Sequence, residues 1–351
     1  MKITTNALFN KLTDALTAKL PFVMYRYPNT KKVKGVFQKT DALFKTVNYL
    51  DSGFIFAPFD NAEPSIFFPI VNSDRYSAIL SEKDLVAIPI TEKGKSNTEI
   101  SKEKHMELVQ KSIDFLNVNA AKKVVISRKE KIDMPNFKVL DTFKRLLQKY
   151  KNTMVYVWYH PHIGLWLGAT PENLLKVNQN TFTTMALAGT QVYQGSLDVV
   201  WEAKERQEQQ FVTDFIVDAL GKQVVLSKTK TVKAGSLLHL CTSISGELRA
   251  KFSLAKLLEI LHPTPAVCGL PMAAAKRFIL ENESYNREYY TGFLGEMNID
   301  NTSNIFVNLR CMQVLERQVA IYIGGGITVA SIPENEWIET IAKSEVMLRM
   351  L

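Results

Sequence analysis

Residues 154–175 read MVYVWYHPHIGLWLGATPENLL, and they give the first indication of the fold class. The two apolar runs MVYVWYHP and IGLWLGA follow each other closely, which is typical of a β-hairpin. A hairpin pairs antiparallel strands. Elsewhere along the chain strands and helices are mixed without regular β-α-β alternation. The sequence therefore predicts an α+β fold with large antiparallel sheets flanked by helices.

Around this hairpin, the chain divides into two expected parts. Residues 1–95 read mostly as short strands, such as PFVMYRYP and GFIFAPF, and we expect a mostly β extension of the same fold. Residues 100–351 form the main domain, which begins after a polar stretch at 91–104. Further helices are expected at 106–116, 139–150, 202–219, 253–261, 271–282 and 333–350, and further strands at 123–128, 182–187, 243–249, 304–311 and 319–324. The motif Ser331-Ile-Pro-Glu334 predicts a capping box for the last helix.

The composition excludes several classes of protein. The chain has 351 residues, of which 46% are hydrophobic and 22% charged, as in ordinary globular proteins. The formal net charge of +8 comes from dispersed residues, which argues against a nucleic-acid-binding surface but would attract small anions. No apolar run is long enough to span a membrane, and no secretion signal is recognisable. Three cysteines without a CxxC motif fit a reduced cytoplasmic compartment.

Two pairs of glutamates have helical spacing and lie about 130 residues apart. They are Glu205 with Glu208 in KERQEQQFV, and Glu336 with Glu339 in PENEWIETIAK. A spacing of three residues puts both carboxylates of a pair on one side of a helix. If the two helices meet, four carboxylates gather in a small volume, and a hard divalent cation such as Mg²⁺ would balance their charge. Such pairs are also common on solvated helices.

Two further residues could act as an acid and a base. Glu172 in GATPENLL either completes the first turn of a helix or is a half-buried carboxylic acid with a raised pKa, able to protonate a leaving hydroxyl. Lys123 precedes the apolar strand VVIS. Its amine either reaches out to water or is partly desolvated and acts as a base. The sequence alone leaves both pairs of alternatives open.

Several other residues suggest anion binding or a pocket wall. Arg310 interrupts the apolar strand NIFVNLRC and needs an anion, either a protein acid or a substrate carboxylate. The glycines of YIGGGI, residues 324–326, predict a turn whose backbone N–H groups could hold a carboxylate. His262 in the rigid loop LHPTPAVCGLP is either a wall residue or a structural histidine. Lys343 lies four residues after Glu339 and shares its helix face.

The order of these motifs resembles that of the chorismate-utilising enzymes, which include isochorismate synthase, salicylate synthase and component I of anthranilate synthase. The resemblance covers about residues 100–351 and rests on GATPE, ALAGT, K-E-x-x-E, LHPTPAV, R-x-x-Y-x-G, G-x-G-I and P-E-x-E-W-x-E-T-x-x-K. It implies the α+β fold of that family, with the active site in an interior cleft. By position, the N-terminal residues look like the variable strands that extend the family's sheet.

The resemblance also implies a magnesium site. Glu208 and Glu339 match the family's direct Mg²⁺ ligands. Glu205 and Glu336 match the acids that complete the surroundings of the ion, directly or through water.

The same resemblance assigns the chemistry and the substrate contacts. Lys123 matches the base and Glu172 the acid. The groups expected to bind the substrate are Ala188, Gly189, Thr190, His262, Ala266, Tyr290, Arg310, Gly324, Gly325, Gly326 and Lys343. Glu283 and Arg287 match an element of the family that we expect to be structural.

The nucleophile separates the branches of this family. Members that add ammonia resemble one another in having a glutamine at the position of Lys123, whereas members that add water have a lysine there. Ala188 replaces the lysine that attacks the ring in the aminodeoxychorismate branch. The resemblance thus implies an isomerase, an isochorismate synthase that uses Mg²⁺ and adds water at C2 of chorismate as the C4 hydroxyl leaves.

The alternative within the family is salicylate synthase, whose members tend to have threonine at the position of Ala266. We expect chorismate as the substrate, no glutaminase subunit and a monomer. The product could enter menaquinone or siderophore biosynthesis, and nothing in the sequence chooses between them.

Overall fold

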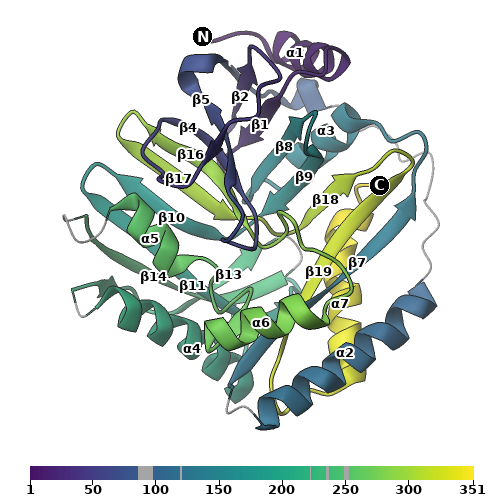
Figure 1. Ribbon diagram of the computed structural model, residues 1–351, viewed down its shortest axis with the longest axis vertical. Helices are drawn as coiled ribbons and strands as arrows, with labels where there is room; N and C mark the ends of the chain where they lie inside the picture. The colour runs from purple at the N-terminus through teal and green to yellow at the C-terminus, as the bar shows by residue number, and fades with distance from the viewer. Residues whose placement is uncertain (86–97, 119–120, 222, 235–236, 249–252) are drawn as a thin grey trace.

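A computed structural model of the chain describes residues 1–85, 98–118, 121–221, 223–234, 237–248 and 253–351. Two large sheets, here called sheet A and sheet B, form the body of the molecule (Figure 1). Sheet A has the order β15 (Gly269–Leu270), β7 (Lys123–Asp133), β19 (Gln318–Ile327), β18 (Cys311–Val314), β9 (Gly164–Thr170), β8 (Met154–His160), β1 (Phe22–Arg26), β2 (Lys32–Gln38) and β6 (Ser73–Ile79).

Sheet B is built in the same way from the remaining named strands. Its order is β12 (Val225–Leu226), β14 (Leu237–Glu247), β11 (Thr181–Val192), β10 (Asn173–Asn178), β17 (Thr302–Val307), β16 (Phe293–Ile299), β4 (Gly53–Ala57), β5 (Ser65–Pro69) and β3 (Lys45–Thr46), with β13 (Lys230–Ala234) beside β14. Neighbouring strands in both sheets pair antiparallel, including the expected hairpin of β8 and β9. The predicted α+β class with large antiparallel sheets is confirmed.

Helices cover the outer faces of both sheets. They are α1 (Thr5–Thr17), α2 (Thr98–Val118), α3 (Val139–Lys149), α4 (Ala203–Leu220), α5 (Leu254–Leu261), α6 (Met272–Asn282) and α7 (Pro333–Leu348). Figure 1 shows α4 and α5 on the side of sheet B, whereas α2 and α7 lie against β7 and β19 of sheet A. Of the helices in the described ranges, none is both long and apolar enough to cross a membrane.

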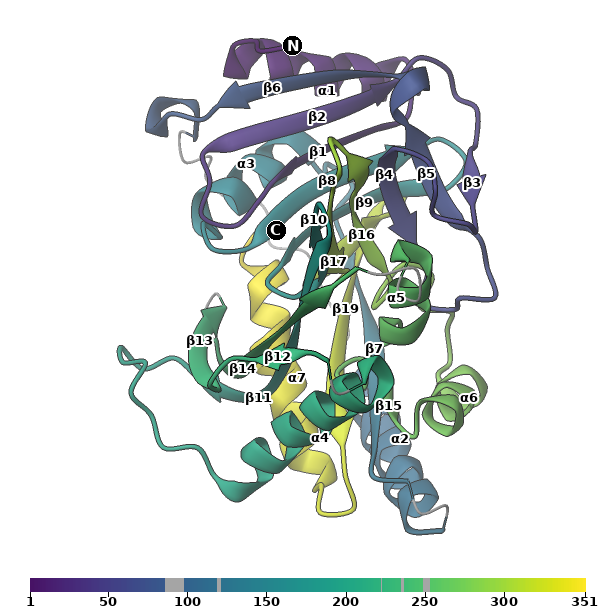
Figure 2. The same cartoon turned by 90° about the vertical axis from the view of Figure 1, so that its left-hand side faces the viewer.

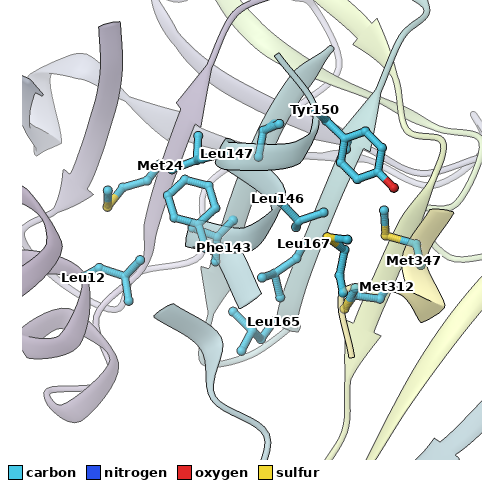
Figure 3. Close-up of a cluster of buried hydrophobic side chains, with 14 of the residues drawn as sticks. Leu12, Met24, Phe143, Leu146, Leu147, Tyr150, Leu165, Leu167, Met312 and Met347 are labelled. Atoms are coloured by element: carbon cyan, nitrogen blue, oxygen red, sulfur yellow. The ribbon is translucent and has the colours of Figure 1, made fainter. Parts of the chain in front are cut away.

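Three groups of apolar side chains hold these layers together. The inner faces of the sheets meet in an aromatic core that includes Phe54, Trp158 and Phe306. A second cluster packs α1 and α3 onto the outer face of sheet A, with Leu12 and Phe143 among its members (Figure 3). A third packs α4 and α5 onto sheet B. Burial of such surfaces is the main stabilising contribution to a fold of this kind.

Helix α1 was not expected, because the first 90 residues read mostly as strands. The Thr4 side chain caps it by accepting a hydrogen bond from the Ala7 backbone N–H. Leu8, Leu12 and Ala15 are buried on one side, the spacing of an amphipathic helix. Figure 2 shows α1 at the end of the molecule that also carries β6 and β2. The strands between residues 22 and 79 join both sheets, and the expected boundary at 95–100 falls outside the described residues.

Two short connections carry the chain from one sheet to the other, and they lie next to each other. Pro171 and Glu172 join β9 of sheet A to β10 of sheet B, and residues 308–310 join β17 of sheet B to β18 of sheet A. The Val307 N–H donates to the Glu172 carbonyl at 3.0 Å, and the Ala169 N–H donates to the Arg310 carbonyl at 3.0 Å. These bonds place Glu172 and Arg310 together where the two sheets meet.

One local prediction at these positions was wrong, and one of two alternatives weighed is not observed. Arg310 was expected in a strand over 304–311, but β17 ends at Val307 and Arg310 has a φ of 49° in the connection between the sheets. Glu172 was weighed as part of a helical turn, yet it joins two strands. In both cases the local apolar pattern continues through a change of sheet, which only long-range pairing reveals.

Two further local predictions also failed. The glycines at 324–326 were expected in a turn, but they lie inside β19 and pair with residues 125–127 of β7. The predicted capping box is absent at α7, because the N-cap is Ile332 and the Ser331 hydroxyl instead accepts from the Thr328 N–H. Pro333 does occupy the first turn, as expected.

Candidate active site

A cavity of about 130 Å³ lies where the two connections meet β7, β11, β19, α4 and α7. It brings together most of the site residues that the sequence suggested. Those on its wall are Glu172, Ala188, Gly189, Thr190, Glu205, Glu208, Ala266, Tyr290, Arg310, Gly324, Gly326, Glu339 and Lys343. Helices more than a hundred residues apart in the chain thus contribute to one cavity.

Glu172 is a buried carboxyl group at this wall. Burial raises its pKa from 4.5 to about 7, although the positive charges of Lys123 and Arg310 act in the opposite direction. The Thr170 hydroxyl accepts a hydrogen bond from the Glu172 N–H at 3.4 Å and donates to the Val307 carbonyl at 2.6 Å. The side chain is therefore held on a fixed backbone, and its carboxyl group can carry a proton near neutral pH.

Lys123 is buried beside the same cavity, with only 2% of its surface exposed. Its ammonium group lies 2.5 Å from Oε1 of Glu208. The lysine does not reach out to water, which was one of the two alternatives. Because its charge also acts on Glu172, the possible base and the possible acid face one cavity.

The four glutamates of the two helical pairs lie around one end of the cavity. Glu205 and Glu208 come from α4, and Glu339 comes from α7. Glu336 is buried beside them, and its pKa is raised by burial and by the neighbouring charge of Glu339. Each acid except Glu205 has a lysine near it: Lys123 for Glu208, Lys343 for Glu339 at 2.5 Å, and Lys204 for Glu336 at 3.6 Å.

These lysines set the charge of the site. Lys343 holds the pKa of Glu339 below its usual value despite burial. Burial alone would raise the pKa of Glu208, but Lys123 and Lys343 outweigh it, and the pKa ends below normal. Both acids are therefore carboxylates at neutral pH, the state that a metal ligand requires.

The carboxylates of these four glutamates suit a hard cation, although three of them now lie next to lysine side chains. Within the described ranges, no group of three or more His, Cys, Asp or Glu side chains is close enough to hold a metal ion directly. However, one oxygen of Glu205 and one of Glu336 are buried without a hydrogen-bond partner. Buried carboxylate oxygens of this kind are suitable ligands for Mg²⁺.

Arg310 brings a positive charge to the wall of the cavity. Its guanidinium lies on the wall, and within the described part of the chain no carboxylate forms an ion pair with it. One of the two alternatives for this residue, a salt bridge to a protein acid, is not observed. An arginine in this state is suited to bind the carboxylate of a small molecule in a bidentate manner.

Tyr290 and the glycines of β19 shape the wall near Arg310. A Cβ atom on Gly324 would lie 2.7 Å from the Tyr290 hydroxyl, and one on Gly326 would lie 2.7 Å from Cε of Lys123. Side chains at these positions would therefore displace Tyr290 and Lys123. The two glycines provide space, a role different from the anion-binding turn that we expected.

Four of the suggested residues are not on the cavity wall: Lys123 and Glu336 are buried beside it, and His262 and Gly325 face elsewhere. His262 is buried elsewhere, where its Nε2 lies 3.1 Å from the Pro58 carbonyl oxygen and its ring packs against Phe293. This arrangement corresponds to the structural alternative weighed for His262. Gly325 points to the other face of β19, toward Glu336.

Lys204 and His239 are among the wall residues that the sequence reasoning missed. Lys204 directly precedes Glu205, so the quoted motif contained it. The Nδ1–H of His239 in β14 donates a 2.8 Å hydrogen bond to the Gly189 carbonyl. Burial, together with the charge of Arg310, lowers its pKa to about 4. A lone histidine within the apolar run LLHLC was the signal for it.

A buried ion pair supports the wall from behind. Glu283 and Arg287 lie 2.5 Å apart, and both are 2% exposed. Arg287 donates to the carbonyls of Val125 and Val267, and Glu283 accepts from Ser127. The pair thereby joins β7 to the loop at 262–271, which fits the structural role expected for it.

Comparison with protein families gives one match over most of the chain. A family model described as "Chorismate binding enzyme" matches residues 71–351. The isochorismate synthase EntC of Escherichia coli is 32% identical over 245 residues, which are 65% of this chain and 62% of EntC. The isochorismate synthase DhbC of Bacillus subtilis is 32% identical over 198 residues, 53% of this chain and half of that protein. The matched segments thus span less than two thirds of these relatives.

Solved structures show the same fold. The crystal structure of DhbC from Bacillus anthracis superposes with a TM-score of 0.80 at 21% identity, covering 98% of this chain and 99% of that one. MenF from Escherichia coli gives a TM-score of 0.76 at 20% identity, with coverage of 94% and 88%. Component I of anthranilate synthase from Streptococcus pneumoniae gives 0.69 at 21% identity, with coverage of 85% and 80%.

Proposed function

Because this chain belongs to the family of chorismate-binding enzymes, we propose that it is an isochorismate synthase, an isomerase that converts chorismate to isochorismate. The observation that carries the proposal is that Glu172 lies on the wall of one cavity and Lys123 is buried beside it, near enough for its charge to act on Glu172. Glu172 has a pKa of about 7 because it is buried, so it can donate a proton at neutral pH. We assign Lys123 as the base. Relatives named isochorismate synthase support the choice within the family.

The cavity suits a ligand with two carboxylates, as chorismate has. Arg310 offers a guanidinium that forms no salt bridge among the described residues, and Lys343 of α7, which is paired with Glu339, adds a second positive charge. The Tyr290 hydroxyl supplies a hydrogen-bond donor next to Gly324. The cavity is smaller than the roughly 300–1,000 Å³ typical of small-molecule sites. Binding would therefore require side chains of the wall, such as Lys204 and Lys343, to move.

A magnesium ion is part of the proposal. Glu205, Glu208, Glu336 and Glu339 would hold it, and when bound it would neutralise a carboxylate of the substrate. A cation at Glu208 would compete with Lys123 for the same oxygen atoms, so the lysine would lose its present partner.

Two proton transfers complete the reaction. Lys123 accepts a proton from a water molecule as that water forms a bond to C2 of the ring. Glu172 donates its proton to the C4 hydroxyl, which leaves as water while the ring double bonds shift. One water is consumed and one is released, so the net reaction is an isomerisation. The required charge states are a neutral amine and a neutral carboxyl group in one enclosed site.

Incubation of the purified protein with chorismate, with and without Mg²⁺, tests the proposal when the products are separated by chromatography. We expect isochorismate, formed only with Mg²⁺. Salicylate with pyruvate would instead indicate the salicylate synthase branch. Anthranilate formed with ammonium, or no product at all, would contradict water addition by Lys123. The proposal needs no glutaminase subunit; the monomeric state and the cytoplasmic location stay predictions.

A further inference from the structure

A second, larger cavity of about 490 Å³ lies among the end of α3, the end of α7 and β13, and positive charge dominates it. Its rim carries Lys149, Lys151, Lys233 and Arg349, whereas Glu345 is the one acid among its lining residues. Four positive charges and one negative charge give a local excess of three. We call this cavity the basic vestibule. Its volume lies within the range of small-molecule sites.

The basic vestibule and the candidate active site share two walls. On α7, Glu339 and Lys343 line the active site, and Val346 lines the vestibule. Their spacing of four and three residues puts them along one side of the helix. On sheet B, Thr190 of β11 lines the active site, and Tyr193, just after the end of β11, lines the vestibule. Lys343 and Arg349 are about 9 Å apart along the helix axis.

Contacts within the vestibule hold its cations in place. The Lys233 ammonium lies 3.4 Å from the centre of the Tyr193 ring, a cation–π contact. The Asn152 side-chain amide donates to the Lys233 carbonyl at 2.6 Å. The Tyr150 hydroxyl donates to the Val346 carbonyl at 2.7 Å and so fixes the end of α3 against α7. These contacts hold the backbone that carries the positive charges, and α7, one of the elements involved, also contributes to the active-site wall.

We propose that the basic vestibule is an entry site that concentrates the dicarboxylate substrate and passes it to the active site. The inference rests on the proposed function, because it takes chorismate as the ligand. A cleft lined by one sign of charge attracts ligands of opposite charge and raises their association rate by about 10- to 1,000-fold. On the active-site wall, Arg310 and Lys343 carry further positive charge, and Lys343 is paired with Glu339. An acidic protein partner is the competing occupant, but a volume of about 490 Å³ fits a small molecule better than a protein segment.

The test compares two double variants with the same change in net charge. Lys151→Glu with Lys233→Glu reverses two charges of the vestibule. Lys45→Glu with Lys176→Glu reverses two exposed lysines on β3 and β10, which do not line either cavity. At low ionic strength we expect kcat/KM for chorismate to fall at least tenfold in the vestibule variant, with kcat within twofold of the wild type. The control variant should keep both constants within about twofold.

Added salt provides a second readout. It screens the long-range attraction between the vestibule and the substrate and leaves the proton-transfer steps unaffected. The decline of kcat/KM with added salt should be steep for the wild type and the control, and shallow for the vestibule variant. Equal losses in both double variants would overturn the entry site, since net charge alone would then explain them. A fall in kcat confined to the vestibule variant would also overturn it.

A binding measurement separates this inference from the proposed function. In a Glu172→Gln background, where turnover is blocked, stopped-flow tryptophan fluorescence reports the association rate of chorismate. A slower rate in the vestibule variant supports the entry site whatever product the wild type makes. Unchanged rates would overturn the entry site and leave the isochorismate synthase proposal intact, whereas a wild type that does not bind chorismate would overturn both.

Discussion

At the scale of single residues, the site combines two carboxyl groups with different charge states. Glu172 is buried, forms no ion pair with any residue that the structure describes and has a pKa of about 7, whereas Glu208 is paired with Lys123 and has a pKa below normal. Burial favours the neutral acid, and a neighbouring ammonium favours the carboxylate. The environment alone therefore separates a proton donor from a potential metal ligand.

Substitution of either proton-transfer residue should abolish most of the turnover. We expect Lys123→Ala and Glu172→Gln each to lower kcat by about 10²- to 10⁴-fold, the usual contribution of a general base or acid. Circular dichroism should show an unchanged fold. A variant that keeps nearly the wild-type rate would remove the role assigned to that residue.

The raised pKa of Glu172 also predicts a pH-dependent change in stability. The unfolded carboxyl group loses its proton near pH 4.5, whereas the folded one keeps it to about pH 7. The folded state thus binds more protons in this window, and stability falls as the pH rises through it. Glu172→Gln removes this effect and should be more stable than the wild type by about 3 kcal/mol above pH 7.

Urea unfolding of both proteins at pH 5 and pH 8 measures this difference. The advantage of the glutamine variant should be small at pH 5 and large at pH 8. An equal difference at both values would mean that Glu172 titrates normally in the folded protein.

At the scale of elements, the glycines of β19 leave space for the side chains that pack against this strand. Gly326 lies where a Cβ atom would meet Cε of Lys123 at 2.7 Å and an oxygen of Glu208 at 3.3 Å. Gly325, its neighbour on the opposite face, has its nearest contact at 3.8 Å from Glu336. Successive residues of a strand alternate between faces, so the two glycines form a matched pair.

Alanine at these two positions should therefore have different effects. We expect Gly326→Ala to displace Lys123 from Glu208 and lower kcat by about 10²-fold, within the range of lost general-base catalysis. Gly325→Ala should retain most of the activity. Steady-state kinetics on both variants gives the comparison, and equal rates would show that the fit around Lys123 is looser than described.

Sequence periodicity predicted most of the long helices, but it failed where the chain passes from one sheet to the other. The helices at 202–219 and 333–350 were found from their periodicity, which is a local property. Arg310 was placed in a strand because its neighbours are apolar on both sides. The transfer of the chain from β17 to β18 depends on pairing with β16 and β9, and no local pattern encodes it.

The site was predictable to a different degree. The spacing of Glu205 and Glu208 predicted which carboxylates share a helix face, and the order of motifs indicated the family. Spacing placed Lys343 on the helix face of Glu339, but it could not reveal that Lys123 pairs with Glu208, because these two residues lie 85 positions apart in the chain. Helix α1 was missed for a different reason. Thr4 caps it, but its buried apolar side is short.

At the scale of the whole molecule, α4 and α7 bring carboxylates to one cavity from distant parts of the chain. A cation bound between them would join the helices, and a ligand that binds only the folded state stabilises it. We expect saturating Mg²⁺, at about 100 times its dissociation constant, to add about 2.7 kcal/mol to the free energy of unfolding. A thermal denaturation series with Mg²⁺ measures the shift.

Two variants make this measurement specific. Glu339→Gln should lose most of the stabilisation by Mg²⁺. Glu281→Gln changes an exposed glutamate of α6 away from the cavity and should keep it. Equal stabilisation of both variants would indicate non-specific binding and remove the assigned metal site.

The central claim is that the protein adds water to C2 of chorismate while the C4 hydroxyl leaves. Turnover in H₂¹⁸O with Mg²⁺, followed by mass spectrometry of the product, tests it most directly. We expect isochorismate that carries one ¹⁸O atom, on the C2 hydroxyl. Unlabelled isochorismate would show direct transfer of the original hydroxyl, and it would contradict the roles of Lys123 and Glu172.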